Sequence, residues 1–172
     1  MRVAADKLTV TPSDGLASSG YQGGPFTPSN KVYTLSNTGT SNLTWAASWA
    51  APWMGVAPSN GTLAAGATTD VTVALTAQAG TLPPGTNADT VVFSNLSSGV
   101  SQSRSVQLVV RERVLDHFAW DPIAPPTQYV GRAFPVKITA QDATSSTLSG
   151  FTNSVLLSSS LSAGARCNES NG

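Results

Sequence analysis

The stretch that decides the fold is residues 31–39, with the sequence KVYTLSNTG. In this stretch Tyr33 and Leu35 alternate with smaller or more polar residues. A period of two places alternate side chains on opposite faces of a β-strand, one towards a core and one towards water. The polar run 37–39, which ends in glycine, is typical of a turn. Residues 31–39 therefore predict a half-buried strand followed by a reversal of the chain.

The same alternation recurs on both sides of this stretch. The inward positions that it predicts are Leu8 and Val10; Leu43, Trp45 and Ala47; Val71, Val73 and Leu75; Val91 and Phe93; and Val106, Leu108 and Val110. Turn sequences rich in glycine, proline and asparagine separate these runs, and no helical stretch is expected. Six or seven short strands at this spacing predict an all-β fold, an antiparallel immunoglobulin-like β-sandwich with Greek-key order, over residues 1–111. Residues 14–28, with four glycines and two prolines, are expected to form a long loop.

The composition excludes several classes of protein. The chain has 172 residues, of which 10% are charged and a quarter are serine or threonine. Glu, Lys and Arg are too scarce for a coiled coil or a helical bundle. A formal net charge of zero disfavours a disordered, charge-rich chain and a basic surface for nucleic acid. We therefore expect no nucleic-acid partner.

Cysteine content and hydropathy give little information on the cellular compartment of the protein. Cys167 is the single cysteine, so the sequence offers no intrachain disulfide and no cysteine-based metal site. No run of about 18 apolar residues predicts insertion into a membrane, and the first residues do not resemble a signal peptide. The sequence is consistent with a cytoplasmic protein or with a piece of a larger exported one.

A second domain is predicted to begin after the charged run 111–113. Residues 112–172 are interpreted as a partial second immunoglobulin-like domain, with strands expected at 115–120, 134–140 and 151–157. A complete sandwich of this type needs about 100 residues, which is more than this segment has. After residue 157 the alternation stops, which leaves open whether the segment ends inside a domain or has a disordered tail.

Several of these segments resemble a known family. The segments are 31–39, 43–45 (LTW), 52–56 (PWMGV), 58–63 (PSNGTL) and 66–73 (GATTDVTV). Their order and spacing resemble the BACON group of bacterial immunoglobulin-like domains over about residues 6–111. Residues 116–120, 134–142 and 149–151 are similar to the opening strands of another bacterial immunoglobulin-like repeat. The resemblance implies a module of a large secreted or cell-surface bacterial protein, or of a phage structural protein. It carries no catalytic residues, and the suspected role of the group is carbohydrate binding.

Candidate catalytic and metal-binding residues are few. His117 is the only histidine, and no Gly-x-Ser-x-Gly elbow accompanies it, so we predict no enzyme and no catalytic site. One histidine and one cysteine exclude a usual transition-metal site, and no cofactor is expected. Calcium prefers oxygen ligands, and a site made by Glu112, Asp116 and Asp142 is the single metal hypothesis.

Aromatic residues give the only candidate ligand site. Trp45 shares the inward side of its strand with Leu43, so it is predicted to lie in the core. Trp49 and Trp53 fall at a strand end and in a predicted hairpin. Their indole faces could stack on sugar rings. The favoured interpretation is that Trp53 plugs the end of the sandwich, and the alternative is that both residues form a ligand platform.

The sequence therefore favours a non-catalytic structural or spacer module whose partners are neighbouring domains of the same polypeptide. The alternatives are a module that binds carbohydrate, or a protein partner through an exposed edge strand. A further alternative is a phage or filament subunit that assembles by strand exchange through the incomplete second domain. The sequence leaves the oligomeric state and any ligand open.

Overall fold

The computed structural model describes residues 7–123, 135–153 and 155. Contacts divide the chain into unit 1, Met1–Arg113, and unit 2, Val114–Gly172. Each unit is described by itself. Within the described residues, no helix has the length and apolarity needed to cross a lipid bilayer.

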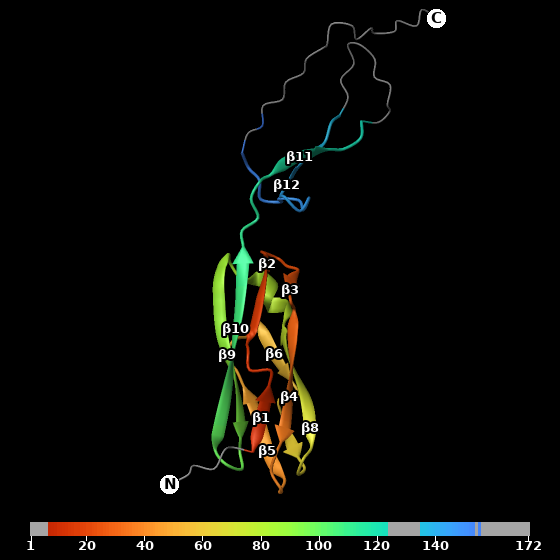
Figure 1. The fold of residues 1–172 in the computed structure, drawn as a ribbon. Coiled ribbons are helices and arrows are strands. Elements are labelled where there is room, and N and C mark those ends of the chain that lie inside the picture. The colour runs from red at the N-terminus through yellow and green to blue at the C-terminus, as the bar shows by residue number, and fades with distance from the viewer. Residues whose placement is uncertain (1–6, 124–134, 154, 156–172) are drawn as a thin grey trace, which may run out of the picture. The chain divides into compact units, whose positions relative to one another are not determined.

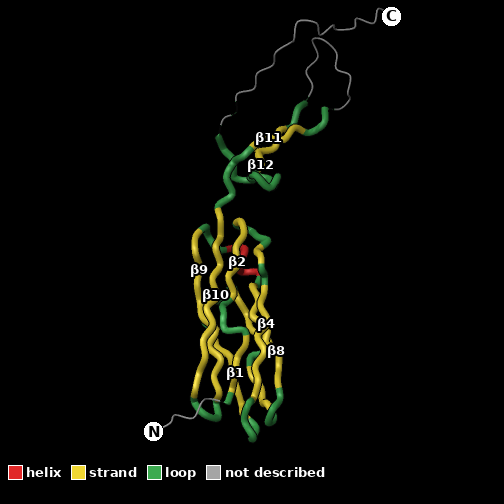
Figure 2. The backbone as a smooth tube through the Cα atoms, in the orientation of Figure 1, coloured by secondary structure: helices red, strands yellow, loops and turns green. Residues whose placement is uncertain are grey.

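Unit 1 consists of two packed sheets (Figures 1 and 2). The four-stranded sheet has the order β1 (Leu8–Thr11), β4 (Asn30–Asn37), β8 (Thr68–Leu75) and β6 (Met54–Ala57). The six-stranded sheet has the order β3 (Phe26–Thr27), β2 (Leu16–Tyr21), β10 (Val100–Arg111), β9 (Gly85–Asn95), β5 (Leu43–Ser48) and β7 (Asn60–Leu63). Only two of the neighbouring pairs, β2 with β3 and β9 with β10, are consecutive in the chain. The prediction of an immunoglobulin-like β-sandwich is confirmed for unit 1.

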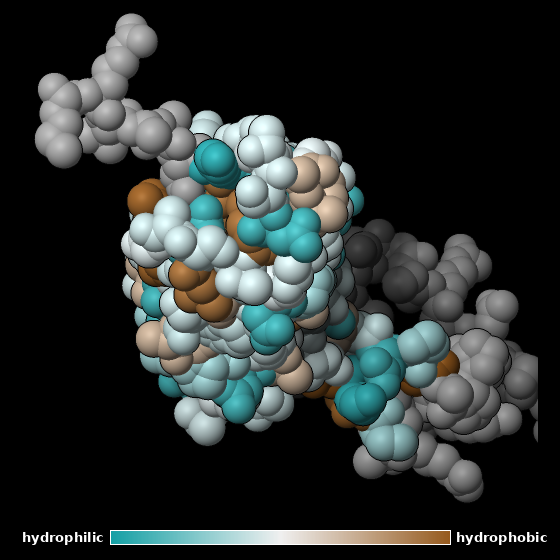
Figure 3. Space-filling view, turned by 90° about the horizontal axis from the view of Figure 1, so that it is seen from below, coloured by the Kyte–Doolittle hydropathy of each residue, from teal (hydrophilic) through white to brown (hydrophobic). Residues whose placement is uncertain are grey.

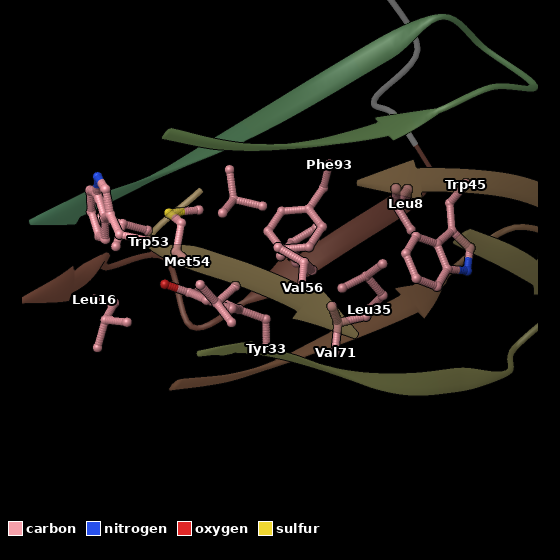
Figure 4. Close-up of a cluster of buried hydrophobic side chains, with 14 of the residues drawn as sticks. Leu8, Leu16, Tyr33, Leu35, Trp45, Trp53, Met54, Val56, Val71 and Phe93 are labelled. Atoms are coloured by element: carbon pink, nitrogen blue, oxygen red, sulfur yellow. The ribbon is translucent and has the colours of Figure 1, made fainter. Parts of the chain in front are cut away.

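The core between the two sheets follows the predicted alternation. Tyr33, Leu35, Val71, Phe93 and Val106 are fully buried, as predicted. The rings of Tyr33 and Phe93 lie 5.6 Å apart between the layers. Figure 4 shows Trp45 and Leu8 at one end of this core and Trp53, Met54 and Leu16 at the other. Two predicted inward residues, Ala47 and Leu75, are only partly buried because they lie near strand ends.

The loop predicted for residues 14–28 is wrong, because β2 and β3 both lie within it. β2 pairs with β10 in parallel, from Leu16 opposite Val106 to Tyr21 opposite Arg111. Leu16 is the one buried large apolar residue of β2, so the alternation within β2 is weak, and its strand conformation depends on hydrogen bonds to β10. The six-stranded sheet is therefore not purely antiparallel, although the remaining pairs are antiparallel.

The hairpin predicted around Trp53 is also wrong. β5 belongs to the six-stranded sheet, whereas β6 pairs with β8 in the other sheet. The segment between β5 and β6 therefore crosses from one sheet to the other. A short 3₁₀ helix, η1 (Ala77–Thr81), adds one helical turn where none was expected, and its Ala79 is buried.

The described part of unit 2 contains two strands, β11 (His117–Trp120) and β12 (Ile138–Gln141). They pair in antiparallel fashion, with Phe118 opposite Ala140. Both strands are shorter than the ranges predicted for them. The strand predicted for 151–157 is absent at residues 151–153, which the structure describes outside any strand, and residues 154, 156 and 157 lie outside the described part. The ring of Phe151 instead packs edge-on against Phe118, with centroids 5.5 Å apart.

The surface of unit 1 is weakly polar. Figure 3 views the end of unit 1 where β9 turns into β10, and most of that face is pale, with brown confined to small separate patches. Leu96 and Val100, at this turn, are 60% and 45% exposed. On β10, Ser101, Ser103 and Ser105 point to solvent between the buried residues of the strand. Hydroxyl groups, rather than charges, cover much of this sheet.

Candidate functional site

The two predicted tryptophans lie in different environments. Trp53 is 6% exposed and packs in the core directly before β6, so its ring face is not open to a ligand in this structure. The main chain around it is fixed by Thr76, whose N–H donates to Trp53 O and whose hydroxyl donates to Pro52 O, both at 2.9 Å. Trp49, directly after β5, is 37% exposed. Of the two predicted ligand residues, only Trp49 offers an accessible ring surface.

Asp89 on β9 positions the segment that follows Trp49. Its Oδ2 accepts hydrogen bonds from the backbone N–H groups of Ala51 (2.6 Å) and Ala50 (3.1 Å). Desolvation raises the pKa of Asp89, but hydrogen bonds from the N–H groups of Ala51, Thr90 and Ala50 outweigh it and lower the pKa below its usual value. The ionised carboxylate is therefore the form that holds residues 50 and 51.

A concavity of about 530 Å³ lies beside this carboxylate on β9 and β10. Its lining consists of Ala88, Asp89, Thr90, Ser105, Val106 and Gln107. Thr90, Ser105 and Gln107 offer two hydroxyls and an amide at this wall, which are groups that hydrogen-bond a neutral polar ligand. Sequence analysis did not single out this surface, although the alternation places Thr90, Ser105 and Gln107 on the solvent side of their strands.

A second polar cluster lies where β1 crosses to β2. The side chains of Gln102 and Arg104 on β10 donate hydrogen bonds to main-chain carbonyls of the β1 segment, and we name these contacts the β1–β10 seam. Gln102 Nε2 donates to Leu8 O at 2.7 Å. Arg104 donates through Nε to Pro12 O at 2.9 Å and through Nη2 to Val10 O. Arg104 is only 8% exposed, so the seam buries a cation among carbonyl dipoles.

Side chains from β4 fix the same crossover from the other side. Lys31 Nζ pairs with the Asp14 carboxylate and donates to Gly15 O at 2.9 Å. Tyr33 Oη donates to Asp14 O at 3.2 Å. The hydrogen bond from Lys31 lowers the pKa of Asp14, while burial raises the pKa of Tyr33. These groups are engaged with one another or with the main chain, which is the arrangement of a structural anchor.

His117 lies at the start of β11 and forms no nucleophilic pair. Its Nδ1 contacts Asp116 Oδ2 at 2.9 Å and its Nε2 contacts Gln141 Oε1 at 3.0 Å. Both ring nitrogens therefore face carboxylate or amide oxygens rather than a serine or threonine hydroxyl.

The structure does not support the calcium site predicted at Glu112, Asp116 and Asp142. Among the described residues, no three His, Cys, Asp or Glu side chains gather in a way that could hold a metal ion. Asp142 is 2% exposed, and its Oδ1 accepts from the N–H groups of Thr144 (2.8 Å) and Ser146 (3.0 Å). This carboxylate closes the turn after β12. Cys167 lies outside the described residues.

Comparisons with known proteins identify no family. No family model matches the chain, and no curated protein matches it. Among solved structures, the chain is similar to the periplasmic chaperone SfaE, at 8% identity and a TM-score of 0.45, over 62% of this chain and 58% of that one. It is also similar to a PapD-like domain of human CEP192, at 17% identity and a TM-score of 0.40, over 62% and 84% of the two chains. A third similarity is to WR4, an MSP family member of C. elegans, at 15% identity and a TM-score of 0.39, over 62% and 99%. Similarities this weak give no basis for transferring a function.

Proposed function

We propose that unit 1 is a non-catalytic structural module that transmits mechanical tension along a larger bacterial surface or secreted protein. In this proposal unit 1 is an immunoglobulin-like module of the BACON type. The observation that supports it best is the parallel pairing of β2 with β10, which joins a strand near the beginning of unit 1 to its last strand. The BACON assignment is supported by the sequence segments from 31 to 73 and by their positions on β4 to β8.

The direction of the chain through unit 1 favours resistance to tension. β1 begins at one end of the sandwich and β10 ends at the other (Figure 1). A force applied through the chain therefore pulls β2 and β10 in opposite directions along their shared axis. Their register of six residue pairs, from Leu16 and Val106 to Tyr21 and Arg111, is loaded together. Sliding strands must break these hydrogen bonds at once, whereas peeling breaks them one at a time.

The β1–β10 seam adds to this resistance. Leu8 and Val10 are joined to β10 through Gln102 and Arg104, and β1 also pairs with β4 over four residues. A pull on the first residues of unit 1 is thereby passed to both sheets. The hydroxyl-covered surface is consistent with a module that makes few strong contacts of its own.

Single-molecule force spectroscopy tests this proposal through the direction of pulling. In a Cys167→Ser background, one variant carries handles at Lys7→Cys and Val114→Cys, which load β2 against β10. The matched variant carries them at Lys7→Cys and Ser98→Cys, which lie at the same end of unit 1 and pull its strands apart sideways. We expect the first variant to unfold at a clearly higher force. Equal unfolding forces would overturn the proposal.

A second candidate function is binding of a neutral polar ligand, such as a glycan, at the concavity beside Asp89. The observation that favours it is the hydroxyl and amide lining of the concavity, and the accessible ring of Trp49 offers a separate surface for stacking. NMR titration with soluble oligosaccharides tests it. Binding at the concavity is expected to be lost in Gln107→Ala and kept in the control Trp120→Ala, an exposed tryptophan of unit 2, whereas loss in Trp49→Ala alone would place the ligand on that tryptophan. Absence of shifts in the wild-type protein would exclude this candidate for those sugars.

A further inference from the structure

The two sheets of unit 1 present four edge strands, β1, β6, β3 and β7. An edge strand exposes main-chain N–H and C=O groups that can pair with another chain, so proteins usually protect such edges with charged residues, prolines or covering groups. The four edges of unit 1 differ in this protection.

The edge of β1 is covered. Thr38 N donates to Lys7 O at 2.8 Å, which directs the Lys7 carbonyl towards β4. Because carbonyls alternate along a strand, those of Leu8 and Val10 point away from β4. These outward carbonyls accept hydrogen bonds from Gln102 and Arg104. The β1–β10 seam therefore leaves no free acceptor at these two positions.

Prolines limit the edges of β3 and β6. β3 is two residues long and lies between Pro25 and Pro28, and β6 is followed directly by Pro58. Proline has no N–H to donate to a ladder, so it interrupts pairing at an edge. Neither edge offers a long run of free donors.

Among the residues that the structure describes, β7 itself carries none of these protections, and the nearest proline is Pro58, two residues before it. Its sequence, Asn60-Gly61-Thr62-Leu63, contains no charge and no proline. Ala47 N donates to Ser59 O at 2.7 Å, and the register continues with Trp45 opposite Gly61. The alternation of an antiparallel ladder then directs the main-chain groups of Gly61 towards β5 and those of Asn60 and Thr62 outwards. Both of these residues are exposed.

We propose that β7 is a contact site for a second copy of this chain, paired in antiparallel fashion about Gly61. In this register Asn60 lies opposite Thr62 of the second copy, and Thr62 lies opposite Asn60 of the second copy. The outward N–H and C=O groups of both residues then form four main-chain hydrogen bonds. In each bond, an N–H group of one copy donates to a C=O group of the other. An identical strand is the occupant because β7 is complementary to itself in this register.

Charge and packing also favour this occupant. The side chains that meet across the axis are an amide and a hydroxyl, and the whole chain has a formal net charge of zero, so the copies do not repel each other. A Cβ at Gly61 would lie 3.1 Å from Trp45 Nε1, so packing of the core favours glycine at the axis. This inference goes beyond the proposed function, because transmission of tension does not require a second copy.

Disulfide trapping tests the register. Asn60→Cys and Thr62→Cys are made separately in a Cys167→Ser background, given different tags, and oxidised alone or mixed. Opposed residues of a hydrogen-bonded antiparallel pair have Cα atoms about 5.5 Å apart, which suits a disulfide. In this register residue 60 of one copy lies two positions along the strand from residue 60 of the other copy. That distance is too long for a disulfide. We expect cross-linking in the mixture and little in either variant alone. Cross-linking that is equal in all three samples, or absent from all three, would overturn the register.

Charge substitution tests the contact without a covalent bond. Asn60→Lys/Thr62→Lys places like charges opposite each other, whereas Asn60→Glu/Thr62→Lys places opposite charges there. Analytical ultracentrifugation over a wide range of concentration should show a weak wild-type dimer. The like-charge variant should dissociate about tenfold more readily than the opposite-charge variant, because directly opposed like charges destabilise strand pairs. Wild-type protein that stays monomeric throughout, or equal dissociation of the two variants, would refute the proposal. Thermal melting of both variants confirms that each is folded.

Discussion

Replacing Arg104 with methionine tests whether the β1–β10 seam stabilises unit 1. Arg104 is 8% exposed and donates hydrogen bonds to the carbonyls of Val10, Pro12 and Ser103. Methionine fills a similar apolar volume but donates nothing. The substitution therefore removes the hydrogen bonds while changing the packing little.

The magnitude follows from the acceptors that lose their donor. Val10 O, which is buried, and Pro12 O, which is partly buried, are left without the guanidinium, and a buried unsatisfied group costs about 1–3 kcal/mol. The methionine also avoids burial of a cation, which offsets part of this loss. We expect the free energy of unfolding to fall by about 3 kcal/mol, a large fraction of the 5–15 kcal/mol that is usual for a domain.

Urea denaturation followed by tryptophan fluorescence measures this change, because Trp45 and Trp53 are buried in unit 1. With an m-value of about 1.5 kcal/mol/M, the midpoint of unfolding should fall by about 2 M. The matched control is Arg111→Met, an exposed arginine at the end of the same strand, which should change stability by less than about 0.5 kcal/mol. If Arg104→Met were as stable as that control, the seam would not contribute as the structure indicates.

Three further predictions concern single residues of unit 1. The hydroxyl of Ser18 is buried without a hydrogen-bond partner in the described structure, so Ser18→Ala should raise the free energy of unfolding by about 1 kcal/mol in urea denaturation; destabilisation would show that the hydroxyl is paired. The pKa of Asp89 is lowered on folding, so its carboxylate stabilises unit 1 above the unfolded pKa of about 4, and this contribution is lost as the pH falls through the folded value. Melting of Asp89→Ala and wild type across pH 2–7 should show a gap at neutral pH that closes in acid, and a constant gap would contradict this. A Cβ at Gly15 would lie 2.1 Å from Ser105 O, so Gly15→Ala should cost about 2 kcal/mol or more, whereas Gly150→Ala, with open space around it, should change melting little.

The sequence predicted the core of unit 1 well because each core strand turns only one face to it. Tyr33, Leu35, Val71 and Phe93 lie where a period of two places them. β2 was missed because Leu16 is its only buried large apolar residue, and its pairing comes from β10, about 90 residues later in the chain. Local pattern holds no information on such distant partners.

The polar cluster could be predicted only in part. Arg104 lies on the inward side of β10, with Val106 and Leu108, and a charge at a core position was a sign of a special role. Its acceptors, Val10 O and Pro12 O, were not predictable, because every residue has a main-chain carbonyl and the sequence does not indicate which of them will accept a hydrogen bond. Trp53 was expected in a hairpin and lies instead on a crossover, since local sequence does not say which sheet the next strand joins.

The most direct test of the central claim is the unfolding force of unit 1 in the two pulling directions. With handles at residues 7 and 114, tension slides β2 along β10, and we predict a high force that falls when Arg104→Met weakens the β1–β10 seam. With handles at residues 7 and 98, strands separate sideways at a lower force. Equal forces in the two directions would contradict the proposal that the pairing of β2 with β10 makes unit 1 a module that transmits tension.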